Sequence, residues 1–142
     1  MNKDKAIELI NNNKASFIIY NKDYYDIGIG VKPIIKIIDT NKLLLDNAYI
    51  VDKIVGKASA MLFVKYNIKY IHGILMSKQA INVLEYHNIE YTYDNICEYI
   101  VNRSNTGLCP LEDCVKDIDI NDINNAEINI RNRIRELMNN EL

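Results

Sequence analysis

Residues 51–60 read Val51-Asp52-Lys53-Ile54-Val55-Gly56-Lys57-Ala58-Ser59-Ala60, and this stretch decides the fold. With the preceding Ala48-Tyr49-Ile50, the start of the stretch is typical of a short strand that is covered on both faces. Small and apolar residues then continue to Tyr66 and predict a helix that lies deep in the domain. A buried strand that leads directly into a buried helix is the repeating unit of an α/β protein.

The segments around this stretch predict a mixed sheet that begins with a β-hairpin and is crossed over by helices, which is an α/β fold. Two strands joined by a short polar turn make the hairpin, and helices alternate with strands after it. In chain order, the expected elements are a helix at 4–10, strands at 16–20 and 24–29, a helix from Lys32, strands at 48–51 and 68–76 with the helix 56–66 between them, a helix after Ser77 and a strand at 90–93.

The C-terminal third has a different character. Cys109 precedes Pro110, a residue that is favoured in the first turn of a helix. A last helix is expected from Asp122, with one apolar stripe along its length. We therefore expect a single domain over residues 1–142, with residues 109–142 forming a C-terminal helical segment that packs on it.

Composition excludes several classes of function. The net charge of −2 comes from interspersed acidic and basic residues, so the chain has no basic stripe for nucleic acid. Apolar runs are far shorter than the roughly 18 residues that span a bilayer, which predicts a soluble protein with no membrane partner. Three cysteines, an odd number, and the polar first residues favour a reducing cytoplasm.

Gly56-Lys57, at the turn from strand to helix, favours an anion, because free backbone N–H groups and the helix dipole are joined there by a lysine. A P-loop is not present, since Val51 and Ala58 stand where its first glycine and its hydroxyl residue would be. Lys53 lies close by in sequence. The alternative is that Gly56 only permits a tight turn and that both lysines are solvated.

A second helix start, Gly30-Val31-Lys32-Pro33, also follows a strand. If the two strands are neighbours, Lys32 and Lys57 face the same crevice. Asp52 follows the buried part of its strand, and ligands of open α/β sheets bind at the carboxyl ends of strands. Its alternative role is to cap the following helix or to pair with a lysine.

Cys109 is the best candidate for a nucleophile, because a helix N-terminus favours the thiolate. Its alternative role is that of a small buried residue. The sequence contains no Cys-x-x-Cys, His-x-Glu or His-x-x-x-His motif, so neither a zinc site of standard spacing nor any other cofactor is expected.

Three motifs together resemble a family of small uncharacterised prokaryotic proteins with a cytidine-deaminase-like fold. They are Gly30-Val31-Lys32-Pro33, Asp52-Lys53-Ile54-Val55-Gly56-Lys57-Ala58 and Asn102-Arg103-Ser104-Asn105-Thr106-Gly107-Leu108-Cys109-Pro110-Leu111-Glu112. The resemblance implies a three-layer α/β/α domain. Zinc deaminases carry a His or Cys with a Glu at one helix start and Pro-Cys-x-x-Cys at the next. Neither helix start has these residues here, so zinc-dependent deamination is not expected, and lysines in such a pocket suit an anionic or phosphorylated ligand.

The sequence predicts three alternative functions for this fold. The first is a binding module for an anionic small molecule or nucleotide, held without zinc at the two helix starts. The second is a metal-independent enzyme with Cys109, Asp52 and Lys57 as catalytic residues. The third is a homo-oligomeric scaffold, in the simplest case a homodimer, that uses Tyr91, Tyr93 and Tyr99 as its interface. The candidate ligand-binding residues are Gly30, Lys32, Pro33, Asp52, Lys53, Gly56, Lys57, Ala58, Cys109 and Glu112.

Overall fold

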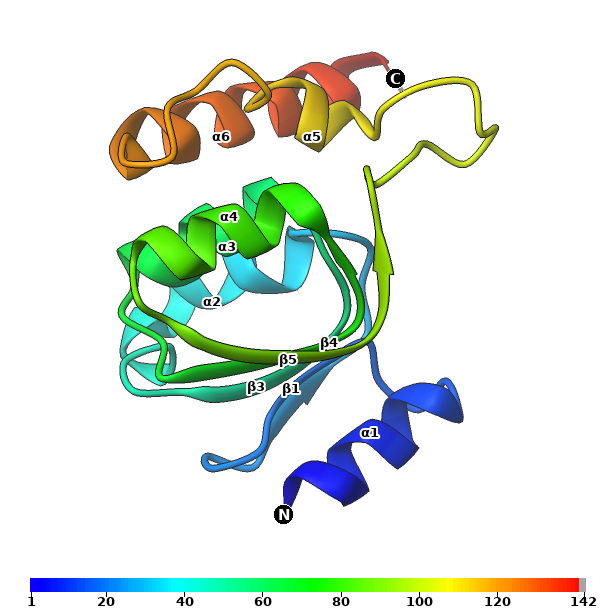
Figure 1. Ribbon diagram of the computed structural model, residues 1–142, viewed down its shortest axis with the longest axis vertical. Coiled ribbons are helices and arrows are strands. Elements are labelled where there is room, and N and C mark those ends of the chain that lie inside the picture. The colour runs from blue at the N-terminus through cyan, green and yellow to red at the C-terminus, as the bar shows by residue number, and fades with distance from the viewer. Residues whose placement is uncertain (141–142) are drawn as a thin grey trace.

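A mixed five-stranded sheet with the strand order β2-β1-β3-β4-β5 forms the centre of the protein in its computed structural model, which describes residues 1–140 (Figure 1). The strands are β1 (Phe17–Ile19), β2 (Tyr24–Asp26), β3 (Tyr49–Val55), β4 (Tyr70–Ser77) and β5 (Glu90–Cys97). The helices are α1 (Lys3–Asn11), α2 (Lys32–Asn41), α3 (Lys57–Lys65), α4 (Lys78–Tyr86), α5 (Pro110–Asp113) and α6 (Ile123–Asn140), with a short 3₁₀ helix, η1 (Lys42–Leu44), after α2.

The sheet is mixed and begins with a hairpin, as the sequence predicts. Strands β1 and β2 form an antiparallel hairpin, and β1 also pairs antiparallel with β3. Strands β3, β4 and β5 are parallel, and α3 and α4 make the crossovers between them. The α/β fold with a mixed sheet that begins with a hairpin is therefore confirmed.

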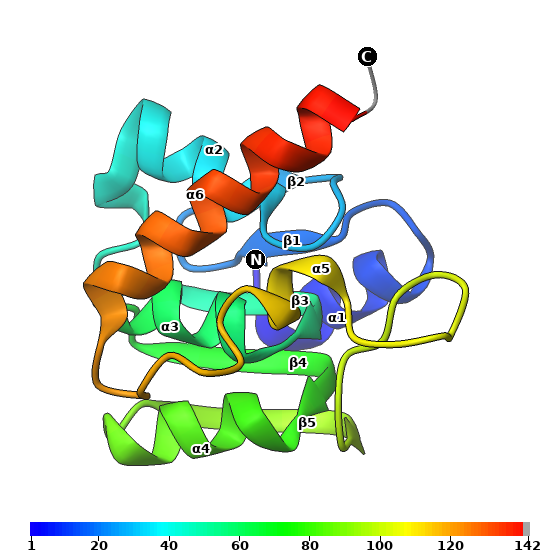
Figure 2. The same ribbon diagram turned by 90° about the horizontal axis from the view of Figure 1, so that it is seen from above.

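Helices cover the sheet unequally. Helix α1 lies on one side, and α2, α3 and α4 lie on the other, with α5 and α6 stacked above them as a further layer (Figure 1). Seen from above, α6 runs across α3 with α5 beside it (Figure 2). The predicted helix–sheet–helix arrangement is present, and the C-terminal segment adds a layer that the three-layer description does not contain.

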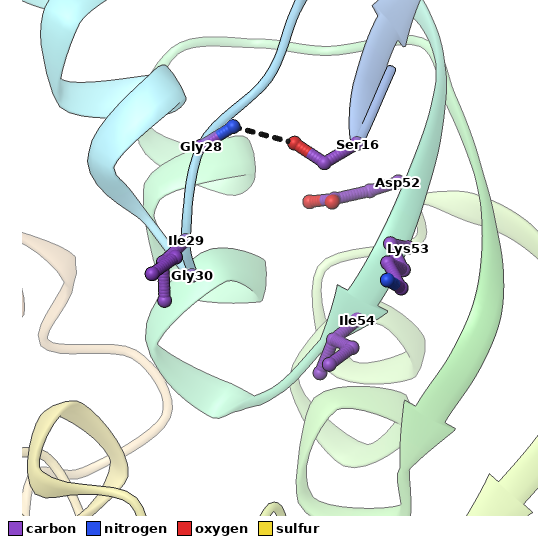
Figure 3. Close-up of a pocket in the computed structure, with 7 residues that line it drawn as sticks. All are labelled: Ser16, Gly28, Ile29, Gly30, Asp52, Lys53 and Ile54. Atoms are coloured by element: carbon purple, nitrogen blue, oxygen red, sulfur yellow. Dashed lines mark hydrogen bonds between the residues drawn. The ribbon is translucent and has the colours of Figure 1, made fainter. Parts of the chain in front are cut away.

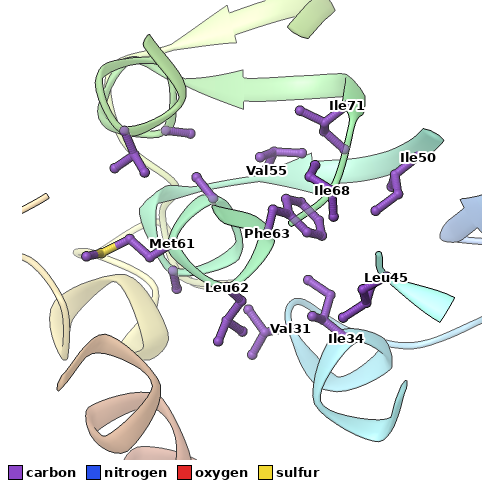
Figure 4. Close-up of a cluster of buried hydrophobic side chains, with 14 of the residues drawn as sticks. Val31, Ile34, Leu45, Ile50, Val55, Met61, Leu62, Phe63, Ile68 and Ile71 are labelled. Atoms are coloured by element: carbon purple, nitrogen blue, oxygen red, sulfur yellow. The ribbon is translucent and has the colours of Figure 1, made fainter. Parts of the chain in front are cut away.

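Helix α3 is the most deeply buried element, as the sequence predicts. Every residue from Lys57 to Phe63 is buried, because the sheet lies below the helix and α6 lies above it. Figure 4 shows Met61, Leu62 and Phe63 within the main hydrophobic core. The start of this helix is consequently fixed in position relative to the end of β3.

Strand β3 is longer than expected. It continues through Asp52 to Val55, four residues beyond the predicted end at Val51. Asp52 pairs with Phe17 of β1 and with Gly73 of β4, so it lies inside the sheet and not after it. The charged residues Asp52 and Lys53 interrupt the apolar run, which is why the sequence pattern ended too early.

Two further details concern the ends of the chain. The N-cap of α1 is Asn2, whose side chain accepts a hydrogen bond from Lys5 N, so the helix begins one residue before the expected start at residue 4. The predicted apolar stripe of the last helix is present, with Ala126 and Ile130 buried. Within residues 1–140, no helix is both long enough and apolar enough to cross a membrane.

Candidate functional site

A crevice lies between the starts of α2 and α3, at the carboxyl end of β3. It consists of two adjoining cavities that share Gly30 and Ile54 in their walls. The larger cavity has a volume of about 150 Å³ (Figure 3). Its lining residues are Ser16, Gly28, Ile29, Gly30, Asp52, Lys53 and Ile54.

Asp52 is the buried acid of the larger cavity. Its side chain points from β3 toward the segment that carries Gly28 and Gly30 (Figure 3), and only 4% of the residue is exposed. Burial raises the pKa of this carboxyl well above its usual value, against the opposing effect of the Lys53 and Ile54 amides. Among the described residues, Oδ2 has no hydrogen-bond partner. Asp52 therefore has unused hydrogen-bonding capacity beside a cavity.

The opposite wall is formed by the chain between β2 and α2. Gly28 N donates a hydrogen bond of 2.9 Å to Ser16 Oγ, so this N–H is already used within the wall. A Cβ on Gly28 would lie 2.7 Å from Pro33 Cγ, and Gly30 has a φ of +57° that favours glycine. The predicted residues Gly30 and Pro33 thus shape this wall through their backbone and ring.

The smaller cavity has a volume of about 30 Å³, which is the space of about one water molecule. It lies between the start of α3 and the C-terminal segment. Its walls include Gly30, Val31, Ile54, Gly56, Ser59, Ile100, Cys109, Leu111 and Glu112. The structure therefore brings the predicted residues Gly30, Gly56, Cys109 and Glu112 together.

Glu112 occupies the N-terminus of α3. Its Oε1 accepts a hydrogen bond of 2.6 Å from Lys57 N, and its Oε2 accepts one of 2.9 Å from Ala58 N. Burial raises the pKa of Glu112, while these two amides and the Lys57 charge oppose the rise. A Cβ on Gly56 would overlap with this carboxylate. The predicted anion position at Gly56-Lys57 thus holds a carboxylate of the same chain.

Lys57 extends away from the crevice. Its Nζ donates hydrogen bonds to Lys116 O at 3.3 Å and to Ile118 O at 2.6 Å, and the residue is 8% exposed. Burial lowers its pKa. The structure consequently does not bring its ammonium group together with Lys32, which is exposed at the start of α2. Ala58 is buried in the core and contributes only its backbone N–H, which Glu112 uses.

The cysteines differ in their surroundings. Cys109 is half-buried at the N-cap of α5, a helix of only four residues, and lines the smaller cavity. Cys114 Sγ donates to Leu111 O at 3.0 Å, and burial raises its pKa to about 11. Cys109 therefore lies beside the α3 start, as the nucleophile hypothesis requires, but it does not line the cavity that holds Asp52.

A polar cluster that sequence reasoning missed lies on the other face of the sheet. His72 Nδ1 is 2.6 Å from Thr92 Oγ1, which also contacts the Tyr70 hydroxyl. His72 Nε2 lies 3.2 Å from Asp94 Oδ1 without the alignment of a hydrogen bond. An alignment of the two predicted strands that places His72 opposite Thr92, as β4 and β5 do, is the signal that could have indicated this pair. Over residues 1–140, no group of three or more His, Cys, Asp or Glu residues could hold a metal ion.

The fold and the crevice define the class: a mixed α/β domain with a crevice at the carboxyl end of a central strand. Residues 5–133 match the model of a family described as Domain of unknown function (DUF1893), and the chain belongs to this family. This match confirms that the family is one of unknown function.

The comparison with solved structures finds the same family. The crystal structure of a DUF1893 family protein (TM1506) from Thermotoga maritima aligns with a TM-score of 0.78 and 22% sequence identity. The alignment covers 96% of this chain and 92% of that one, so the two share a fold. A comparison with curated proteins finds no match. The resemblance to deaminases stays a prediction, because neither comparison names a deaminase.

Proposed function

We propose that this protein is a binding module for a small molecule that enters the larger cavity and contacts Asp52. The observation that carries this proposal is the buried Asp52 carboxyl, which has one oxygen without a partner among the described residues and lies at a cavity of about 150 Å³. An unsatisfied buried acceptor costs about 1–3 kcal/mol of stability. A bound ligand that satisfies Oδ2 would offset this cost.

The anionic part of the ligand belongs outside the cavity. At the start of α3 the amides of Lys57 and Ala58 are already bound to Glu112. At the start of α2, by contrast, no described side chain makes a capping hydrogen bond. Lys53 is exposed and lines the cavity, and Lys32 is exposed at the first turn of α2. A phosphorylated metabolite or nucleotide could therefore place a polar group inside and its phosphate near these lysines.

Binding is favoured over catalysis by the positions of the predicted catalytic residues. Cys109 and Asp52 line different cavities, and the Lys57 ammonium is bound to backbone carbonyls away from both. The metal-independent enzyme is supported by one observation only, that Cys109 and Glu112 share the smaller cavity. The homodimer stays a prediction, with Tyr93 and Tyr99 exposed at 41% and 56%.

Thermal unfolding with a panel of nucleotides and sugar phosphates tests the proposal. A ligand at about 100 times its Kd adds about 2.7 kcal/mol of stability, which is a rise of several degrees in Tm. We expect at least one compound to raise the Tm of the wild type and to lose this effect in Asp52→Leu. Asp94→Asn, an acid on the other face of the sheet, is the matched control and should behave as wild type. No stabilisation by any compound would overturn the proposal.

A further inference from the structure

We propose that the group bound by Asp52 is the amidine edge of a nitrogen heterocycle, in which an N–H donor lies next to a ring nitrogen. This inference rests on the proposed function and specifies the ligand. It starts from the hydrogen-bonding groups around the larger cavity, since these decide which edge of a ligand can be satisfied inside it.

Two hydrogen-bonding groups of the cavity wall are already used within the wall. Gly28 N–H donates to Ser16 Oγ, and the Ser16 hydroxyl donates in turn to Asp26 O at 3.5 Å. Asp52 Oδ2 is left without a partner among the described residues. A ligand edge that carries both a donor and an acceptor can pair with this carboxyl whether the carboxyl is ionised or neutral.

Both protonation states of Asp52 select the same kind of edge. A neutral carboxyl offers one donor and one acceptor, which match the ring nitrogen and the N–H of a neutral amidine edge. An ionised carboxylate offers two acceptors, which match the two N–H groups of the protonated edge. Burial of Asp52 favours the neutral pair. In either state, a cyclic amidine forms two parallel hydrogen bonds with one side chain.

The cavity volume limits the ligand to a single ring at this position. About 150 Å³ is the size of an engineered cavity that binds benzene in another protein. Asp52 is only 4% exposed, so a ring reaches Oδ2 when the segment that carries Gly28 and Gly30 moves outward slightly. The hydrogen bond between Gly28 N and Ser16 Oγ holds that segment, so the Gly28 amide should report binding.

An NMR titration with 2-aminopyridine and 2-methylpyridine tests this inference. The two probes have nearly the same shape, but only the first carries the exocyclic N–H donor. We expect 2-aminopyridine to cause saturable shifts of the Gly28, Gly30, Lys53 and Ile54 amides of the wild type. One added hydrogen bond is worth about 1.4 kcal/mol, so 2-methylpyridine should bind about ten-fold more weakly.

Substitutions of Asp52 distinguish a direct contact between Asp52 and the probe from a general effect on the cavity. Asp52→Leu should abolish the shifts caused by 2-aminopyridine, with the dispersion of its spectrum showing that it is folded. Asp52→Asn, whose amide keeps a donor and an acceptor, should retain binding, and Asp94→Asn should bind as wild type.

The outcomes for the inference and for the proposed function are distinguishable. Equal binding of both probes, or full binding by folded Asp52→Leu, would overturn the amidine edge and leave a small-molecule site in place. If neither probe shifts the cavity amides while a compound of the thermal panel stabilises the wild type, the inference fails and the proposed function stands. If nothing in either experiment binds, both fail.

Discussion

Asp52 has a buried carboxyl and Glu112 a partly buried one, and their surroundings give them different roles. Both oxygens of Glu112 accept backbone hydrogen bonds at the start of α3. Asp52 has an oxygen without a partner among the described residues. Burial raises the pKa of both groups. Glu112 is therefore a structural cap, whereas Asp52 is the residue with capacity for a ligand.

Asp52→Asn should stabilise the protein, and the gain should grow with pH. Because the folded-state pKa of Asp52 is raised, the protonated form favours folding, and its contribution is fully present below about pH 4. This stabilisation is lost as the pH rises through the folded-state pKa of Asp52. The free energy of unfolding of the wild type therefore falls, while that of Asp52→Asn does not.

Urea denaturation at about pH 4 and pH 8 measures this difference. We expect Asp52→Asn to gain about 1–3 kcal/mol over the wild type at the higher pH and much less at the lower one. Glu112 titrates in both proteins, so its contribution cancels in the comparison. A gain that is equal at both pH values would show that Asp52 has no raised pKa in the folded protein.

Gly56→Ala should destabilise the protein because its Cβ would overlap with the Glu112 carboxylate. We expect a loss of about 1–3 kcal/mol, measured by chemical denaturation. Gly107→Ala is the matched control, since no described atom lies within 4 Å of its added Cβ. In an Glu112→Ala background, the cost of Gly56→Ala should fall to a few tenths of a kcal/mol. Equal losses of stability from Gly56→Ala with and without Glu112 would show that the overlap with Glu112 does not cause the loss.

The sequence indicates Gly56 and Glu112 as candidate site residues, but it does not predict the contact between them. Gly56 stands at a strand-to-helix turn, a position that is evident from the apolar pattern on either side. Its partner Glu112 is 55 residues from Lys57, and no spacing rule connects the two. An acid in the first turn of a short helix gave no sign that its carboxylate would cap a different helix. The pattern indicated that the α3 start suits an anion, and in the structure the Glu112 carboxylate of the same chain lies there.

At the scale of elements, helix α6 shows what periodicity predicts well. Its apolar stripe follows the 3.6-residue repeat, and the buried residues Ala126 and Ile130 lie on it. The repeat does not identify the partners of its basic residues: Arg131 pairs with Asp39 of α2 at 2.7 Å, and Arg133 donates to Pro110 O at 2.8 Å. Hydrophobic spacing fixes which face of a helix is buried, whereas the partners of its charges depend on tertiary structure.

Ile130→Ala should cost about 2–4 kcal/mol of unfolding free energy, because the residue is fully buried in the main core between α6 and the elements below. Ile128→Ala removes the same atoms from a side chain on α6 that is 54% exposed, and it should cost less than about 0.5 kcal/mol. Urea denaturation of the two variants gives the comparison. Similar losses would mean that α6 does not pack on the domain as described.

At the scale of the whole molecule, the C-terminal segment covers the start of α3 and forms a wall of the smaller cavity. Glu112 binds the backbone at the start of α3, and the Lys57 side chain binds Lys116 O and Ile118 O in return. These contacts place α5 and the following loop over the helix start, beside α6 (Figure 2). The sequence predicts a C-terminal helical segment, residues 109–142, that packs on the domain. Within the described residues of this segment, Glu112 covers the α3 start, and the Asp52 cavity lies beside it.

The crystal structure of the protein soaked with 2-aminopyridine tests the central claim most directly. We expect the ring in the larger cavity, with its amino nitrogen about 3 Å from Asp52 Oδ2 and Glu112 still bound to the amides of Lys57 and Ala58. A ring found only outside this cavity, or an empty cavity in a crystal that holds the compound elsewhere, would contradict the assignment of Asp52 as the ligand-binding residue.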